Sequence, residues 1–241
     1  LPLISAGCPS ILNLIQIRFP NLMEHVVDYR PPVEVVASMA RRGAGRRHPD
    51  KKVGIFFIAP CTAKISFIKE SDEVVDSDID KMIAISDIYK QVLQNLEELK
   101  DEEIEDLEKA GMTGLRWPSP GGESLSLQTD DFVAVDGIDK VIDIFEKIED
   151  EKLDGLAFVE TEACRGGCFG GSLTVENSYS AKANIKPLID EAKEKYGERT
   201  LNLPGEEDEL LRNRPLCYRP VLRLDEDLDV SLKKMEEMGR V

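Results

Sequence analysis

The sequence lacks the features that mark several common functional classes. It has no run of about 18 apolar residues, so we expect no membrane-spanning helix. It begins without the basic segment of a signal peptide, and it contains no phosphate-binding loop or dinucleotide fingerprint. With no Cys-x2-Cys pair and only two histidines, no zinc-type spacing is present, and we interpret His25 and His48 as surface or structural residues.

Basic charge is also scarce. Lys and Arg total 31 against 47 Asp and Glu, which gives a net charge of −16. Nucleic-acid binding usually needs a basic stripe, so this balance argues against a nucleic-acid partner. The acidity is compatible with a basic redox partner. We also expect a cytoplasmic protein.

The length of 241 residues fits one large domain or two small lobes, and 41% hydrophobic residues can form a core. Because the chain starts without Met inside an apparent core segment, we expect an N-terminally truncated fragment.

Short apolar runs alternate with amphipathic segments, which predicts an α/β fold with a largely parallel sheet flanked by helices. A basic, glycine-rich surface loop is expected at 43–52 and a long loop rich in Gly, Pro and Ser at 111–128. We expect strands at 53–59, 81–86, 132–135, 156–159 and 221–224. We expect helices at 9–19, at 33–42 after two prolines, at 88–99 with Asp87 as N-cap, at 138–148, at 182–196 broken near Pro187, and at 230–238. The segment 101–110 is expected to continue the preceding helix or to form another short one, and 201–214 is expected to be an acidic loop.

Four of the five cysteines lie in three short motifs: GCPS at Cys8, APCTAK at Cys61, and EACRGGC at Cys164 and Cys168. A [4Fe–4S] cluster needs four thiolates, and glycines let the backbone approach a bulky inorganic core. The odd count and the absence of an oxidising context disfavour disulfides. Cys217 has no glycines and no partner nearby, so we interpret it as structural.

Each motif also has a simpler interpretation when taken alone. The Cys164–Cys168 loop could be a tight glycine turn with free thiols, and Lys64 could be a surface lysine rather than a donor to an anionic ligand. Cys8 could be a core residue, although a helix N-terminus favours thiolate ligation. Two of the motifs follow the strands expected at 53–59 and 156–159. The loops after these strands should project to the same edge of one sheet, because ligands gather at the carboxyl ends of parallel strands. We therefore expect Cys61, Cys164 and Cys168 to be neighbours.

In this order, the three motifs resemble the signatures of the [FeFe]-hydrogenase catalytic domain, and the resemblance extends through LIQIRFPNL, PPVEVVASMARR and GGSLTVEN. It implies one two-lobed domain over 1–241 that holds the H-cluster between its lobes. That cofactor is a [4Fe–4S] cluster bridged through a cysteine sulfur to a diiron unit with CO, cyanide and azadithiolate ligands.

The resemblance also implies roles for particular residues. Cys168 matches the cysteine that bridges to the diiron unit, and Lys64 matches the lysine that hydrogen-bonds a cyanide. The four cluster cysteines correspond to Cys8, Cys61, Cys164 and Cys168, and the positions that line the diiron pocket correspond to Pro32, Ala59, Trp117 and Glu162.

The sequence departs from the family pattern at three positions. Gly7 stands where prototypical enzymes have a cysteine that relays protons, and Ala59 and Glu162 replace positions that are usually methionine. Loss of the relay thiol predicts slow proton transfer, for which Glu162 could offer another carrier. The pattern resembles the sensory subclass of the family, although its additional iron–sulfur and PAS domains are not in this sequence.

The resemblance therefore implies slow, reversible H₂ oxidation and proton reduction used for H₂ sensing. It also implies iron–sulfur electron-transfer domains or a ferredoxin-like protein as redox partner, and hydrogenase maturases for cofactor insertion. Two alternatives remain open: a non-catalytic iron–sulfur protein of cluster assembly or redox sensing, and an apo structural module.

Overall fold

A computed structural model describes residues 1–70, 77–96, 110–127, 130–153 and 155–197. Its first sheet contains three parallel strands in the order β1 (Leu3–Ile4), β5 (Phe158–Glu162) and β4 (Phe132–Asp136). Phe158, at the start of β5, pairs in register with both Leu3 and Phe132.

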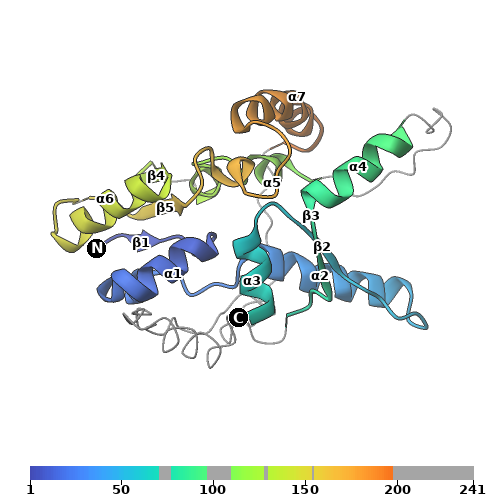
Figure 1. The fold of residues 1–241 in the computed structure, drawn as a ribbon, viewed down its shortest axis with the longest axis horizontal. Coiled ribbons are helices and arrows are strands. Elements are labelled where there is room, and N and C mark those ends of the chain that lie inside the picture. The colour runs from blue at the N-terminus through green and yellow to red at the C-terminus, as the bar shows by residue number, and fades with distance from the viewer. Residues whose placement is uncertain (71–76, 97–109, 128–129, 154, 198–241) are drawn as a thin grey trace, which may run out of the picture.

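The second sheet contains two parallel strands, β2 (Phe56–Ala59) and β3 (Lys81–Ala84), paired from Phe56↔Lys81 to Ala59↔Ala84. All the described strand pairs are parallel, which confirms the α/β class. The strands form two small sheets on different sides of the molecule, with helices around both (Figure 1).

One apolar core fastens the three-stranded sheet to its neighbouring helices. In α6 (Ile138–Glu149), Val141, Phe145 and Ile148 recur at helical spacing and are fully buried. The rings of Phe19 and Phe145 meet edge to face, with centroids 5.4 Å apart. Residues of this core that come from other segments are Ile4, Ile11, Ile15, Leu22 and Val159.

The remaining elements surround the two sheets. No described helix is long and apolar enough to span a membrane. These elements are the helices α1 (Pro9–Arg18), α2 (Pro32–Arg47), α3 (Thr62–Glu70), α4 (Ile85–Leu96), α5 (Met112–Arg116) and α7 (Ser178–Tyr196), and the 3₁₀ turns η1 (Pro20–His25), η2 (Ser124–Leu127) and η3 (Gly167–Gly170).

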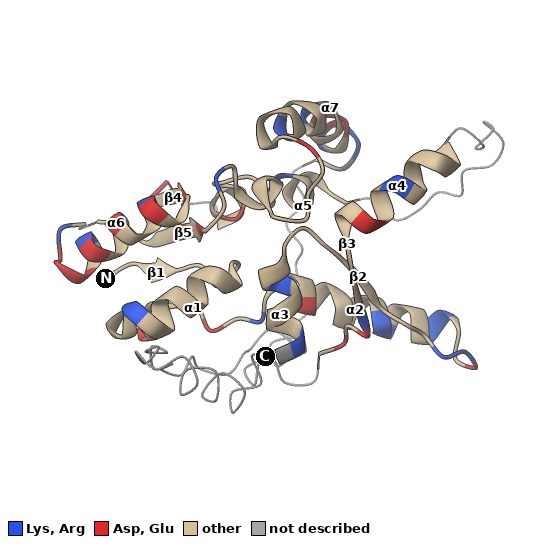
Figure 2. Ribbon diagram, in the orientation of Figure 1, with Lys and Arg blue, Asp and Glu red and all other residues tan. Residues whose placement is uncertain are grey.

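The expected loop at 43–52 is wrong in its first half, because α2 continues through Gly43 and Gly45 to Arg47. Figure 2 shows the resulting concentration of Lys and Arg over the second half of this helix. Arg41 fixes the helix to the chain that follows, since its guanidinium donates to the carbonyl oxygens of Val53 and Asp78.

Two further helices differ from expectation. Because α4 begins at Ile85, Asp87 lies in its first turn and is not the N-cap. The helix α7 begins at Ser178, where the Asn177 side chain accepts a hydrogen bond from the Tyr179 N–H, and it continues through Pro187 without ending there. The expected loop at 111–128 contains α5 and η2. Cys217 and the predictions for 101–109, 201–214, 221–224 and 230–238 lie outside the described residues.

Candidate functional site

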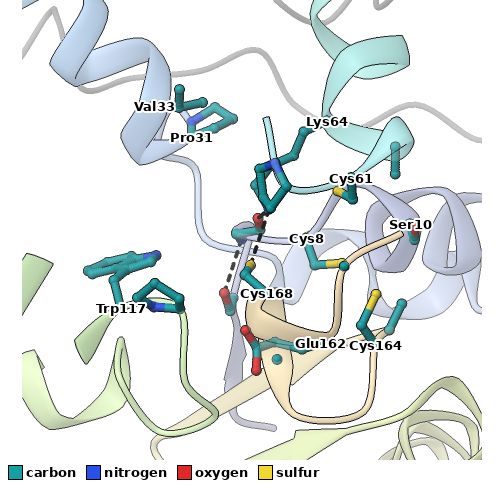
Figure 3. Close-up of a pocket in the computed structure, with 18 of the residues that line it drawn as sticks. Cys8, Ser10, Pro31, Val33, Cys61, Lys64, Trp117, Glu162, Cys164 and Cys168 are labelled. Atoms are coloured by element: carbon teal, nitrogen blue, oxygen red, sulfur yellow. Dashed lines mark hydrogen bonds between the residues drawn. The ribbon is translucent and has the colours of Figure 1, made fainter. Parts of the chain in front are cut away.

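A cavity of about 290 Å³ lies where the connections that follow β1, β2 and β5 meet. The side chains in Figure 3 surround this space, with Lys64 reaching in from α3 and Glu162 from the end of β5. Four cysteines line the cavity: Cys8, Cys61, Cys164 and Cys168. The structure thus gathers the four cysteines that the motifs singled out.

Cys8 and Cys164 follow adjacent strands of one sheet, because β1 pairs with β5. Cys8 is the N-cap residue of α1, with Pro9 in the first turn as expected. Its carbonyl accepts hydrogen bonds from the N–H groups of Ile11 and Leu12 at 3.0 and 3.1 Å. The start of α1 therefore fixes the backbone of Cys8 at the cavity wall.

Cys61 reaches the cavity from the other sheet, which corrects the expectation of a single shared sheet edge. It follows β2, whereas Cys164 and Cys168 follow β5 in the three-stranded sheet. The two connections are joined through Pro60, whose carbonyl oxygen accepts a hydrogen bond from Leu173 N at 2.9 Å. Convergence of the cysteines therefore depends on loop-to-loop contacts between the sheets.

Gly167, in the Cys164–Cys168 loop, and Gly171, shortly after it, allow the neighbouring connections to pack closely. A Cβ on Gly167 would lie 2.5 Å from the Pro118 carbonyl oxygen, and one on Gly171 would lie 2.3 Å from that of Pro60. Gly167 also has a φ of 73°, a conformation that favours glycine. Close packing against neighbouring carbonyl groups therefore also requires glycine at these two positions.

Lys64 is the cation closest to the thiols in the described part of the cavity wall. Its ammonium is 3.5 Å from Cys168 Sγ and 3.4 Å from the carbonyl oxygen of Gly7. Burial opposes its charge, but attraction to the thiolate forms of Cys168, Cys8 and Cys61 outweighs burial and raises the pKa of Lys64. The site therefore holds a positive charge where an anionic ligand could accept a hydrogen bond.

Two of the thiols, those of Cys164 and Cys168, are poor acids. Burial, reinforced by Glu162 and Cys8, raises the pKa of Cys168 to about 11 against the pull of Lys64. Burial also raises the pKa of Cys164. Because metal ligation requires thiolates, binding at Cys168 would release a proton at neutral pH.

The candidate donors in this cavity are four thiols, which is the donor set of an iron–sulfur cluster. Within the described residues, no group of three or more His, Cys, Asp or Glu side chains is arranged to hold one metal ion. A tetrahedral zinc site would need sulfurs only about 3.8 Å apart. A four-iron cluster takes one thiolate per iron and spreads the four sulfurs wider. Four cysteines around one cavity therefore fit a [4Fe–4S] group.

Glu162 lies at the end of β5 with 9% of its surface exposed, and its Oε2 is buried without a described partner. Burial, with the nearby Glu160 charge as the next cause, raises the pKa of Glu162 to about 8. A protonated carboxyl therefore faces the cavity at neutral pH. Pro32 and Trp117 line the cavity too, whereas Ala59 is fully buried at the end of β2 and is not part of the lining.

The motifs did not indicate several polar residues of the wall, among them Ser5, Glu123 and Glu160. The strand expected at 156–159 instead runs from Phe158 to Glu162, so it extends into residues that were expected to form the loop before Cys164. In fact every residue of β5 from Phe158 to Glu162 is buried. One feature of the sequence could have indicated these buried carboxyl groups: two glutamates lie directly between an apolar run and a cysteine motif.

A family model described as the C-terminal domain of the iron-only hydrogenase large subunit matches residues 1–130 and 94–172. The chain belongs to this family. No curated protein sequence is significantly similar to it.

Solved structures of [FeFe]-hydrogenases share the fold of this hydrogenase domain. One, from work on oxygen inactivation, is 17% identical with a TM-score of 0.61, and the match covers 92% of this chain and 77% of the other. Another, from work on stepwise H-cluster assembly, is 18% identical with a TM-score of 0.61 and coverages of 90% and 76%. A variant of HydA1 from Chlamydomonas reinhardtii is 17% identical with a TM-score of 0.61 and coverages of 92% and 77%.

Proposed function

We propose that this domain binds an H-cluster and slowly interconverts H₂ with two protons and two electrons, for use in H₂ sensing. The supporting observation is that four cysteines from three separate connections, together with Lys64, line one cavity. When bound, the cofactor supplies the metal centre at which protons and electrons combine. Cys8, Cys61, Cys164 and Cys168 would hold the [4Fe–4S] cluster, and Cys168 would also hold the diiron unit.

The chain's own residues would hold and shield this cofactor. Lys64, beside Cys168 Sγ, would donate a hydrogen bond to an anionic ligand of the diiron unit. Pro32 and Trp117 would cover the diiron side of the cavity. Glu162 would hold a proton at the end of β5 or tune the cluster, because its carboxyl is buried and protonated at neutral pH. Glu162→Gln should then change turnover or the redox behaviour of the cofactor, and unchanged values of both would contradict this role.

The same proposal includes one domain over 1–241, electron delivery by iron–sulfur domains or a ferredoxin-like protein, and cofactor insertion by hydrogenase maturases. We also propose a cytoplasmic location. The net charge of −16 argues against a nucleic-acid partner. Low rates agree with Gly7, which has no side chain to carry a proton.

The second candidate is a non-catalytic iron–sulfur protein that uses only the four cysteines. Gly7 favours this candidate, because the position beside Cys8 carries no thiol. Lys64 favours the hydrogenase, since a buried ammonium that faces the cavity suits anionic ligands of a diiron unit.

Infrared spectroscopy separates the two candidates. The protein would be produced with the hydrogenase maturation machinery, with Cys168→Ser as the test variant and Ser180→Ala, an exposed position on α7, as the control. We expect CO and cyanide stretching bands in the wild type and the control, and their loss in Cys168→Ser. A folded, iron-loaded wild type without these bands would instead identify a non-catalytic iron–sulfur protein.

A further inference from the structure

The Cys164–Cys168 loop is fastened to the end of the neighbouring strand. Asp136 is the last residue of β4, which pairs with β5 in the parallel sheet. Its carboxylate oxygen Oδ2 accepts a hydrogen bond from Gly166 N at 2.5 Å. Beside this contact, backbone hydrogen bonds of 2.9 and 3.0 Å join 137–138 to 162–163. The end of β4 therefore holds the chain both before and inside the cysteine loop.

The turn at Gly166 has little conformational freedom. Its φ of 85° is left-handed, a conformation that favours glycine. A Cβ at this position would lie 2.6 Å from the side chain of Ser178, the first residue of α7. Because an unpaired N–H in a partly buried turn is unfavourable, the Asp136 carboxylate stabilises the conformation that carries both cysteines.

Three consecutive N–H groups of this loop, 166–168, have acceptors within the protein. The first donates to Asp136, and the second donates to the Cys164 carbonyl oxygen at 3.1 Å. The third bonds the Glu162 carboxyl. Hydrogen bonds to the sulfurs of an iron–sulfur cluster help to set its reduction potential, as do nearby charge and solvent exposure. The loop therefore leaves fewer of its N–H donors for cluster sulfurs.

The charge of Asp136 reaches the cavity wall. Burial is the main cause of the raised pKa of Glu162, and the Asp136 charge is one of the smaller causes. A negative charge that acts on Glu162 also acts on a cluster held by the same loop. It disfavours reduction, because reduction adds an electron to the cluster.

We propose that Asp136 is a positioning residue of the Cys164–Cys168 loop and that its negative charge lowers the reduction potential of a [4Fe–4S] cluster bound there. The carboxylate would act through Gly166 N, since that bond fixes the turn between the two thiols. The inference rests on the proposed binding of the cluster by four cysteines, and it does not depend on hydrogen chemistry.

The first test measures the potential in the full chain, reconstituted anaerobically with iron and sulfide. Asp136→Asn keeps an acceptor oxygen but removes the charge. A redox titration followed by electron paramagnetic resonance should show a higher potential, with the equilibrium constant for one-electron reduction raised about tenfold, or about 59 mV. Asp143→Asn, at an exposed site on α6, makes the same change of charge away from the loop and should leave the potential unchanged.

The second test measures positioning as iron retention against a chelator. Asp136→Ala removes both the acceptor and the charge, and it should weaken retention about tenfold or more, whereas Asp136→Asn should retain iron as the wild type does. Wild-type potential in Asp136→Asn would overturn the charge effect, and wild-type retention in Asp136→Ala would overturn the positioning role. A folded wild type that binds no [4Fe–4S] cluster would overturn the proposed function, and this inference with it.

Discussion

The three-stranded and two-stranded sheets both deliver cysteines to the cavity, but they are packed by different forces. In the first, all five residues of β5 are buried, and one apolar core joins it to α1 and α6. In the second, Phe56 and Ile58 on β2 are 59% and 46% exposed, and no described residue of α4 is fully buried.

Polar contacts hold the region around the two-stranded sheet. Glu34 on α2 is fully buried and accepts hydrogen bonds from Ser77 Oγ at 2.8 and 3.0 Å. Arg41 pairs with Asp78 at 3.0 Å and with Asp80 at 2.7 Å. The cysteines that follow β1 and β5 are thus anchored by apolar burial, whereas Cys61 and Lys64 depend on directional contacts.

The largest effect should come from the apolar core. Phe145→Ala removes a fully buried ring and should lower the free energy of unfolding by about 3–5 kcal/mol. Phe56→Ala, its matched control on exposed β2, should cost less than about 1 kcal/mol. Chemical denaturation measures both, and equal losses would break the contrast between the two sheets.

The next largest effect should come from the loop contact that joins the two sheets. Gly171→Ala places a methyl group against the Pro60 carbonyl and should cost about 1–3 kcal/mol in unfolding free energy. Gly45→Ala, in the interior of α2 with open space around it, should stabilise the protein by up to about 1 kcal/mol. Iron loading should fall in the first variant only. Full loading with unchanged stability would show that the loop contact does not align Cys61.

Ser77→Ala tests the polar contacts around the two-stranded sheet. It leaves the buried Glu34 carboxylate with fewer donors and should cost about 1–2 kcal/mol in thermal or chemical unfolding. Ser66→Ala, at an exposed site on α3, should be neutral. A neutral result at Ser77 would mean that solvent or apolar contacts stabilise this region instead.

The smallest predicted effect is a difference in how pH changes the folding stability contributed by the two regions. Burial raises the pKa of Glu123 to about 7, so its ionisation opposes folding as pH rises from about 4.5 through 7. In the metal-free protein, Glu123→Gln should therefore stabilise by about 1 kcal/mol at pH 8, after allowance for solvent screening, and by nothing at pH 4.

Asp80, near the two-stranded sheet, should show the opposite sign. The backbone N–H of Ile55 and the Arg41 guanidinium hold its pKa below the usual range, so its contribution to stability is lost as pH falls through that pKa. Asp80→Asn should destabilise at pH 7 and have no effect at low pH. The same sign of pH dependence in both variants would contradict the assigned environments.

Local pattern was sufficient to predict much of this domain. Apolar spacing predicted α6, continuous apolar runs predicted parallel strands near β2 and β3, and the three cysteine motifs with Lys64 predicted one shared site. These features are local because hydrophobic period and motif spacing are set by consecutive residues.

Only the tertiary structure decided how the strands divide into two sheets, since pairing partners are far apart in sequence. It also showed that Gly167 and Gly171 accommodate neighbouring carbonyl groups, and that Glu160 belongs to a buried strand. The pairing of Ser5 with Glu123 bridges 118 positions, which no local pattern could indicate. Sequence alone therefore determined the donor set of the site, whereas long-range packing determined its shape, its protonation and the groups beside Gly7.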